Sequence, residues 1–145
     1  MQGFKISTDK QELDLDVIHD FVSKSYWAAG IPKDTMQQAI NNSLCFGVYK
    51  DNGEQVGFAR LITDSATFAY LADVFILEEC RGLGLSKLLM DSVINHSSVP
   101  GLRRMMLATR DAHGLYAQYG FEEVVNPEIL MQKWQPNIYQ NKAVN

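Results

Sequence analysis

The sequence lacks the features that mark several classes of protein. Its 145 residues include only two cysteines, Cys45 and Cys80, whose separation fits no metal-ligand motif. No apolar run approaches the roughly 18 residues that a membrane-spanning helix needs. No signal peptide is recognisable at the start of the chain. These absences predict a cytoplasmic protein with reduced thiols, no metal site and no membrane partner.

Positive charge is also scarce. The chain carries 13 Lys and Arg residues against 17 Asp and Glu residues, a formal net charge of -4. Such a balance gives no broad positive field with which to bind nucleic acid. The pair Arg103-Arg104 is more simply interpreted as a solvated turn before a strand. We therefore expect no nucleic-acid partner, and any anion site must be local.

What the chain does have is an ordinary globular composition. Hydrophobic residues make up 46% and charged residues 21%. The length suits one domain with a substantial core, and no internal repeat or linker is visible. The sequence predicts a single domain over residues 1–145, with its core at about 4–134 and a polar tail at 135–145.

Hydrophobic periodicity predicts a mixture of strands and helices. Helices are expected at about 14–26, 32–42, 85–96 and 112–119, and strands at 4–7, 44–49, 56–62, 68–76, 105–108, 121–125 and 129–134. This order belongs to the α/β (α+β) class. It predicts one mixed central sheet of about six to seven strands with helices on both faces.

The run Phe68 to Ile76 contains one conspicuous acid. Its other residues are nearly all apolar, which is typical of a strand buried on both faces. Burial would raise the pKa of Asp73 toward a value useful to a general base. An equally good interpretation makes Asp73 a structural acid, paired with Arg60 or Arg110.

A glycine loop, Arg81-Gly82-Leu83-Gly84-Leu85-Ser86, joins that strand to the next helix. Glycine lets backbone N–H groups turn toward an anion, and the positive end of the helix points at the same place. The loop is a candidate phosphate site, although a lone Gly-x-Gly also fits a plain turn. It is not a Walker loop, because Lys87 follows the hydroxyl residue, and it lacks the third glycine of the dinucleotide fingerprint.

Further motifs surround this loop. Arg81, Gly84 and Ser86 follow the pattern Arg/Gln-x-x-Gly-x-Gly/Ala, with serine as a departure at the last position. The segment Ala112 to Phe121 follows Ala-x-x-Leu-Tyr-x-x-x-Gly-Phe. The chain thus resembles the GCN5-related N-acetyltransferase (GNAT) family. The order of elements agrees over residues 4–134, and the specific motifs lie within 70–122.

The resemblance implies a fold and a donor. In this family the fourth and fifth strands splay apart, and the pantetheine arm of acetyl-CoA lies between them. Acetyl-CoA is therefore the expected donor substrate, without a metal, and homodimers are common. The expected cofactor-binding residues are Phe75, Ile76, Arg81, Gly82, Leu83, Gly84, Leu85, Ser86 and Thr109. Thr109 departs from the asparagine that many members carry there.

The resemblance also suggests catalytic roles. Tyr116 occupies the position of the general acid, whereas Tyr119 suits a core position better. The general base is Asp73 or His113, because histidine titrates near neutrality and His113 lies one turn before Tyr116. The expected acceptor pocket includes Trp27, Arg60, Tyr70 and Arg110. The two arginines could hold a carboxylate, which suggests a small amino acid or related amine as acceptor.

Two functions from different classes remain. The first is an N-acetyltransferase in which a primary amine attacks the thioester directly. The second is a non-catalytic module that binds acetyl-CoA or CoA through the same loop. A nucleoside-triphosphate-binding enzyme is disfavoured, because the Walker lysine is missing.

Overall fold

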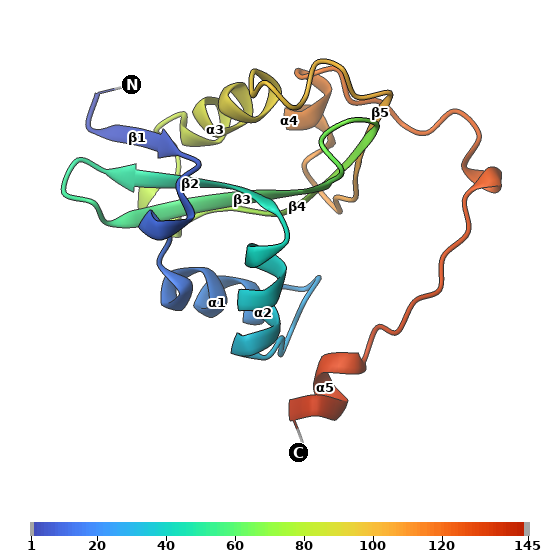
Figure 1. The fold of residues 1–145 in the computed structure, drawn as a ribbon, viewed down its shortest axis with the longest axis horizontal. Helices are drawn as coiled ribbons and strands as arrows, with labels where there is room; N and C mark the ends of the chain where they lie inside the picture. Colours follow the sequence, from blue (N-terminus) through green and yellow to red (C-terminus); the bar gives the residue numbers. More distant parts are fainter. Residues whose placement is uncertain (1, 144–145) are drawn as a thin grey trace.

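Apolar, aromatic-rich runs form the strands of one sheet. In the computed structural model, which describes residues 2–143, five strands lie in the order β1-β2-β3-β4-β5 (Figure 1). Their bounds are Phe4–Ser7 (β1), Leu44–Lys50 (β2), Gln55–Thr63 (β3), Phe68–Ile76 (β4) and Arg104–Leu107 (β5). The first four pair antiparallel, and β5 runs parallel to β4. The expected α/β class and mixed sheet are confirmed.

The expected number of strands is wrong. The sheet has five strands rather than six or seven, because residues 121–125 and 129–134 pair with no strand in the described part of the chain. Their apolar pattern is suited to a strand, but a strand also needs a ladder partner. Pro127–Ile129 forms a 3₁₀ turn (η3), and the chain then runs out from the body to a short helix, α5 (Ile138–Ala143) (Figure 1).

The expected helices are present with shorter bounds. They are α1 (Leu15–Ser23), α2 (Lys33–Asn41), α3 (Leu85–Ile94) and α4 (His113–Ala117). Asp14 caps α1, since its carboxylate accepts the N–H groups of Asp16 and Val17. Two further 3₁₀ turns span Lys10–Glu12 (η1) and Glu78–Cys80 (η2).

The sheet separates two hydrophobic cores. On one face, α1 and α2 pack Ile18, Val22, Met36 and Ile40 against Phe58 and Phe75 of the sheet. On the other face, α3 and α4 cover a larger cluster that includes Leu85, Leu89, Met90, Val93 and Tyr116. Figure 1 shows these two helical layers on opposite sides of the strands.

A β-bulge lies in the middle of β4. Arg60 pairs with Ala72 and Phe58 with Phe75, so β4 carries one residue more than β3 over this stretch. Asp73 takes a positive φ of 55° there. An extra residue reverses the alternation of a strand. Leu71 and Ile76 consequently face the same core, although their numbers differ in parity.

We expect Leu89→Ala in α3 to lower the free energy of unfolding by about 2–5 kcal/mol, because the leucine is fully buried and its truncation leaves a cavity. Urea denaturation measures this loss. The control, Leu83→Ala, removes a side chain that is 51% exposed and should change stability by less than about 0.5 kcal/mol. Equal effects of the two substitutions would contradict this placement of α3.

Candidate active site

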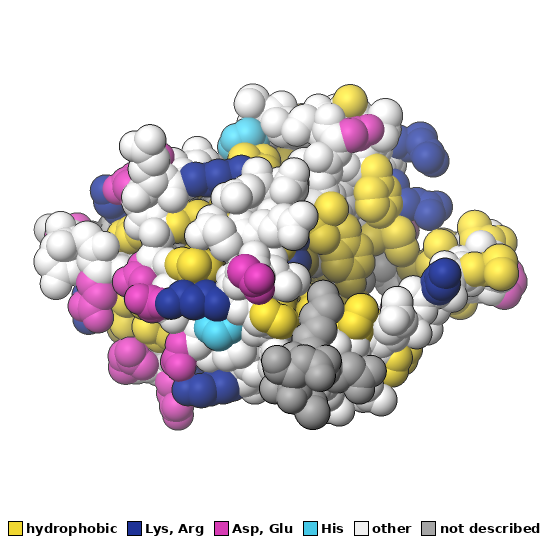
Figure 2. Space-filling model, turned by 60° about the horizontal axis from the view of Figure 1, so that its bottom comes forward, with side chains coloured by type: hydrophobic (Ala, Val, Ile, Leu, Met, Phe, Trp, Pro, Cys, Tyr) yellow, Lys and Arg dark blue, Asp and Glu magenta, His cyan; other side chains and the backbone are white. Residues whose placement is uncertain are grey.

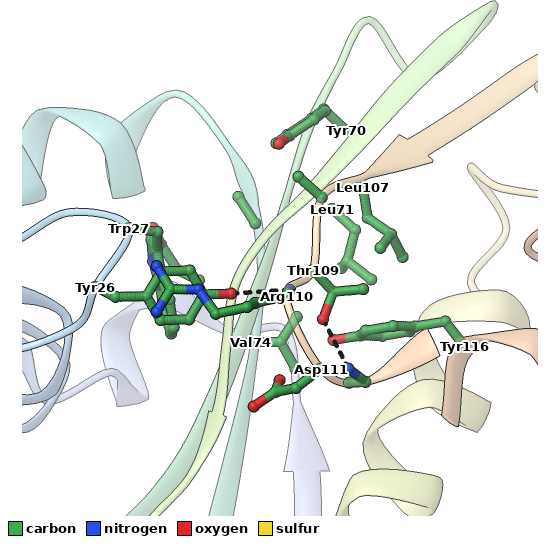
Figure 3. Close-up of a pocket in the computed structure, with 14 residues that line it drawn as sticks. Tyr26, Trp27, Tyr70, Leu71, Val74, Leu107, Thr109, Arg110, Asp111 and Tyr116 are labelled. Atoms are coloured by element: carbon green, nitrogen blue, oxygen red, sulfur yellow. Dashed lines mark hydrogen bonds between the residues drawn. The ribbon is translucent and has the colours of Figure 1, made fainter. Parts of the chain in front are cut away.

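A cleft opens where β4 and β5 part. The two strands pair only from Phe68 with Arg104 to Leu71 with Leu107, and β4 continues to Ile76 without β5 beside it. The resulting cavity of ≈ 330 Å³ is lined by β4, by residues 107–112 from the last residue of β5 onward, by Tyr26 and Trp27, and by Tyr116 of α4. Figure 3 shows Tyr26 and Arg110 on one side of it and Tyr116 on the other. The splayed strands implied by the resemblance are thus present.

Asp73 is held in the cleft wall by a buried network. Its Oδ2 accepts from Nε of Arg60 at 2.5 Å, and its Oδ1 accepts from Nε1 of Trp27 at 2.8 Å. Arg60 also donates to Oγ of Ser43 at 3.1 Å. Both carboxylate oxygens therefore have a donor, as in the structural pairing that the sequence left open. Arg60 itself lies behind Asp73 and is absent from the residues that line the cavity.

An aromatic and cationic wall faces the solvent side of the cleft. The guanidinium carbon of Arg110 lies 3.8 Å from the ring centroid of Tyr26, a cation–π contact. The Tyr26 hydroxyl accepts the backbone N–H of Arg110 at 3.2 Å, and the Tyr26 and Trp27 rings meet edge to face. No salt bridge within residues 2–143 involves Arg110. With Tyr70, these side chains can bind a small organic molecule and its carboxylate.

Tyr116 reaches the cleft from the opposite side. Its side chain is buried and packs edge to face on Phe121. Burial, with smaller effects of Tyr26 and Asp111, raises the pKa of Tyr116, so the phenol stays protonated at neutral pH. Tyr119 instead packs at the edge of the core and donates to the Lys87 carbonyl. Tyr116 thus lines the cleft and also belongs to the core on the α3 side of the sheet, whereas Tyr119 does not line the cleft.

The residues around α4 divide between two sides. Thr109 lines the cleft, and its Oγ1 accepts the N–H of Ala112 at 3.1 Å. His113 is exposed and borders a different hollow, on the far side of Tyr116. Asp111, which the sequence analysis did not single out, lines the cleft. The only feature of the sequence that could have indicated a role for Asp111 is its place directly after the candidate Arg110.

The glycine loop has the backbone form that an anion site needs. Gly82 and Gly84 have φ of 81° and 83°, a left-handed conformation that glycine adopts without steric cost. Gly84 is the N-cap of α3, and no described residue accepts the N–H groups of residues 82–87. A Cβ at Gly82 would meet open space. These groups fit a phosphate at the positive end of α3.

Side chains beside the loop add charge and order. Nε of Arg81 donates to the carbonyl of Ile76 at 3.1 Å, which ties the loop to the end of β4. A carbonyl has a second lone pair, so this contact leaves Ile76 able to accept one more donor. Consecutive residues of a strand face opposite sides of the sheet. The last two residues of β4 therefore differ: Phe75 packs in the core beside α1 and Ile76 in the core beside α3. Ser86 is partly exposed in the first turn of α3.

A mixed sheet whose fourth and fifth strands part beside such a loop defines the GNAT acetyltransferase fold. The family model of the GNAT acetyltransferase domain matches residues 7–133. A provisionally named acetyltransferase of Gibberella zeae is 35% identical over 79% of this chain and 76% of its own. The chain belongs to the GNAT family of acetyltransferases.

Solved structures agree with this assignment. The crystal structure of a provisionally named GNAT acetyltransferase from Xanthomonas campestris is 52% identical, with a TM-score of 0.92 over 96% of this chain and 98% of that chain. Glucosamine-6-phosphate N-acetyltransferase from Arabidopsis thaliana is 14% identical, with a TM-score of 0.62 over 92% and 99% of the two chains, which shows a shared fold alone.

Family membership makes this chain an acyltransferase of a family whose donor is acetyl-CoA. Across residues 2–143, no helix combines the length and the apolar content that crossing a membrane requires. The same residues contain no group of three or more His, Cys, Asp or Glu side chains that could hold a metal ion.

We expect Gly84→Val to abolish acetyl-CoA binding while the helical circular dichroism signal is retained. A β-branched residue at φ 83° is strained by at least about 1–2 kcal/mol and would turn the loop N–H groups away from the phosphate. Calorimetric titration measures the loss. Gly101→Ala is the control, because a Cβ there meets open space at an ordinary φ. Normal binding by Gly84→Val would exclude the loop as the phosphate site.

Proposed function

We propose that this chain is an acetyl-CoA-dependent N-acetyltransferase that acts on a primary amine of a small molecule, such as an amino acid or related amine. One observation carries the proposal. The cleft between β4 and β5 brings Tyr116 and the wall of Tyr26 and Arg110 together, and the glycine loop lies at the end of the same β4. The proposed donor site, acid and acceptor pocket therefore all lie beside β4.

The donor would follow β4. Its pyrophosphate lies on the N–H groups of residues 82–86, with Arg81 supplying charge and Ser86 a hydroxyl. The pantetheine arm fills the gap beside residues 72–76, where β4 lacks a strand neighbour, and bonds to the backbone near Phe75 and Ile76. Thr109, on the β5 side, stands where many members of the family carry asparagine. The same backbone would polarise the thioester carbonyl.

The reaction proposed is a direct attack. The neutral amine nitrogen bonds to the thioester carbon, the C–S bond breaks, and the thiolate takes a proton from Tyr116. Holding the reactants in this geometry can contribute about 7–11 kcal/mol. A phenol whose pKa is raised by burial remains a proton donor throughout the physiological range.

The amine must also lose a proton. Asp73 and His113 are the candidates that the sequence offered, and the contacts favour different roles for them. Asp73 holds Arg60 and Trp27 with both oxygens, which suits positioning. His113 borders the far hollow. We add Asp111 as a third candidate, because its exposed carboxylate lines the cleft and can pass the proton to solvent.

The remaining parts of the proposal concern the cellular location, the domain organisation and the partners of the protein. A reducing, cytoplasmic location suits the two buried free thiols, Cys45 and Cys80. We propose one acetyltransferase domain without a metal or nucleic-acid partner, consistent with the net charge of -4. A non-catalytic module that binds acetyl-CoA would share the loop, but it would need neither Tyr116 nor an acceptor pocket.

We expect Tyr116→Phe to keep acetyl-CoA affinity and to lower kcat by about 10²–10⁴, because the thiolate then leaves without its proton donor. Thiol release under saturating donor measures kcat, and calorimetry measures affinity. Tyr119→Phe is the matched control and should leave both values within about twofold. Unchanged turnover in Tyr116→Phe would remove this residue from the mechanism.

We expect Arg110→Gln to raise KM for acceptors that carry a carboxylate by about tenfold or more, since a charge-assisted hydrogen bond contributes roughly 1.5–3 kcal/mol. For amines that lack a carboxylate, KM should change little. The comparison uses steady-state kinetics on pairs such as an amino acid and its decarboxylated amine. Equal changes for both members of a pair would contradict carboxylate recognition by Arg110.

A further inference from the structure

Part of the sheet lies outside the cover of its helices. Ile62 of β3 and Tyr70 of β4 are direct partners in the ladder, and the next pair is Leu61 with Leu71. Leu61 and Leu71 both pack in the core beside α3. Because successive residues of a strand face opposite sides, Ile62 and Tyr70 face the side of α1 and α2. The core that these two helices cover in the described chain contains neither of them.

Phe68 extends this uncovered surface along β4. It lies two residues before Tyr70 and therefore on the same face. We call Ile62, Phe68 and Tyr70 the platform. Ile62 is 45% exposed and Phe68 is 37% exposed, whereas Tyr70 is half-buried. Figure 2, which brings the α1 and α2 side forward, shows hydrophobic side chains gathered to the right of its centre.

The platform has the size of one large side chain. Neighbouring strands lie about 5 Å apart, and two residues along a strand span about 7 Å. A patch of these dimensions is too small for a protein partner, whose interface would need about 800 Å² on each side. A small molecule is therefore the better occupant.

The platform continues directly into the cleft. Tyr70 belongs to the platform and also lines the cleft. The aromatic wall of the cleft lies on the same side of the sheet, because Trp27 packs on Phe21, which belongs with the α1 and α2 core. Figure 3 shows Tyr70 at one end of the cleft, with Arg110 on one side and Tyr116 on the other. An acceptor whose carboxylate binds Arg110 thus has the platform as a third surface.

Charged groups around the platform disfavour a cationic occupant. Arg104 pairs with Phe68 in the ladder, so its exposed side chain leaves the same face and would repel an ammonium group. The nearby acid, Asp64, is engaged by its own turn: its carboxylate accepts the N–H groups of residues 66, 67 and 68 and the hydroxyl of Thr67. A polar side chain on Ile62 and Phe68 would lose water without gaining a partner. An apolar one would remove all of these apolar surfaces from water.

We propose that the platform binds the side chain of the acceptor, and that the acceptor is an amino acid with a large apolar side chain. This inference rests on the proposed N-acetyltransferase function and specifies its acceptor. The neutral α-amino nitrogen bonds to the thioester carbon and loses a proton to the base, the C–S bond breaks, and the thiolate takes a proton from Tyr116. The products are an N-acetyl amino acid and CoA.

The first test compares acceptors of one shape. Leucine and asparagine have side chains of nearly equal size, but only that of leucine is apolar. KM for leucine and for phenylalanine should be at least about tenfold lower than KM for asparagine and for glycine, since an apolar site discriminates by this order for each methylene. Equal KM values for leucine and asparagine would overturn the proposal.

The second test changes the platform. In Ile62→Ser/Phe68→Ser, the preference for leucine over glycine should fall to about one. The matched control is Ile62→Val/Phe68→Leu, which keeps an apolar surface and should retain the preference. Both positions are more than one-third exposed, so native circular dichroism is expected for both double variants. A serine variant that keeps the full preference would contradict the platform as the side-chain site.

Two further measurements separate this inference from the function on which it rests. Calorimetric titration of leucine and asparagine into the CoA-bound protein measures affinity without turnover, and leucine should bind at least about tenfold more tightly. If no amine raises thiol release, the proposed function fails, and this titration still decides the role of the platform. If every amino acid raises thiol release with the same KM, the function stands and the platform fails.

Sedimentation tests the other possible occupant, a second copy of this chain. Ile62→Ser/Phe68→Ser should have the same mass in solution as the native chain. A lower mass for the variant would assign the platform to a contact between copies and would overturn the proposal.

Discussion

A buried ion pair between Arg60 and Asp73 is the contact on which the rest of the site depends. It holds an aspartate with a φ of 55° in the middle of a strand, where a left-handed residue costs about 1–2 kcal/mol. The same carboxylate fixes Trp27 in the cleft wall. The bulge lies between Ala72 and Phe75, and the last residue of β4 that pairs with β5 is Leu71. The bulge therefore begins where the two strands part. Removing either partner would leave a buried charge unpaired, at a cost of about 3–5 kcal/mol.

The strand that carries this bulge connects the two halves of the proposed reaction. Its middle lines the cleft with residues that include Tyr70 and Asp73, and its end leads through η2 into the loop of Gly82 and Gly84. Nε of Arg81 donates to the carbonyl of Ile76, which joins the loop to the end of the strand. A donor that lies along β4 would therefore have its phosphates and its thioester positioned by the same strand and the loop that follows it. Tyr116 and Arg110 reach the same space from the β5 side.

Much of this arrangement follows from local sequence. Glycine at positive φ and apolar runs act locally, so the loop and the strands β1 to β5 could be predicted. The bulge could not, because it depends on how β4 pairs with β3. The strands expected at 121–125 and 129–134 were wrong for a related reason: a strand exists only beside a partner, and none lies beside these residues in a single chain. The sides taken by Asp111 and His113 depend on how α4 packs, which periodicity over five residues cannot specify.

The central claim, that this cleft transfers acetyl groups to amines, is tested most directly by thiol release from acetyl-CoA with a panel of amino acids, polyamines, aminoglycosides and peptide N-termini. The account predicts amine-dependent thiol release, fastest with a small acceptor that carries a carboxylate. It is contradicted if acetyl-CoA binds but no amine raises thiol release above the rate seen without an acceptor.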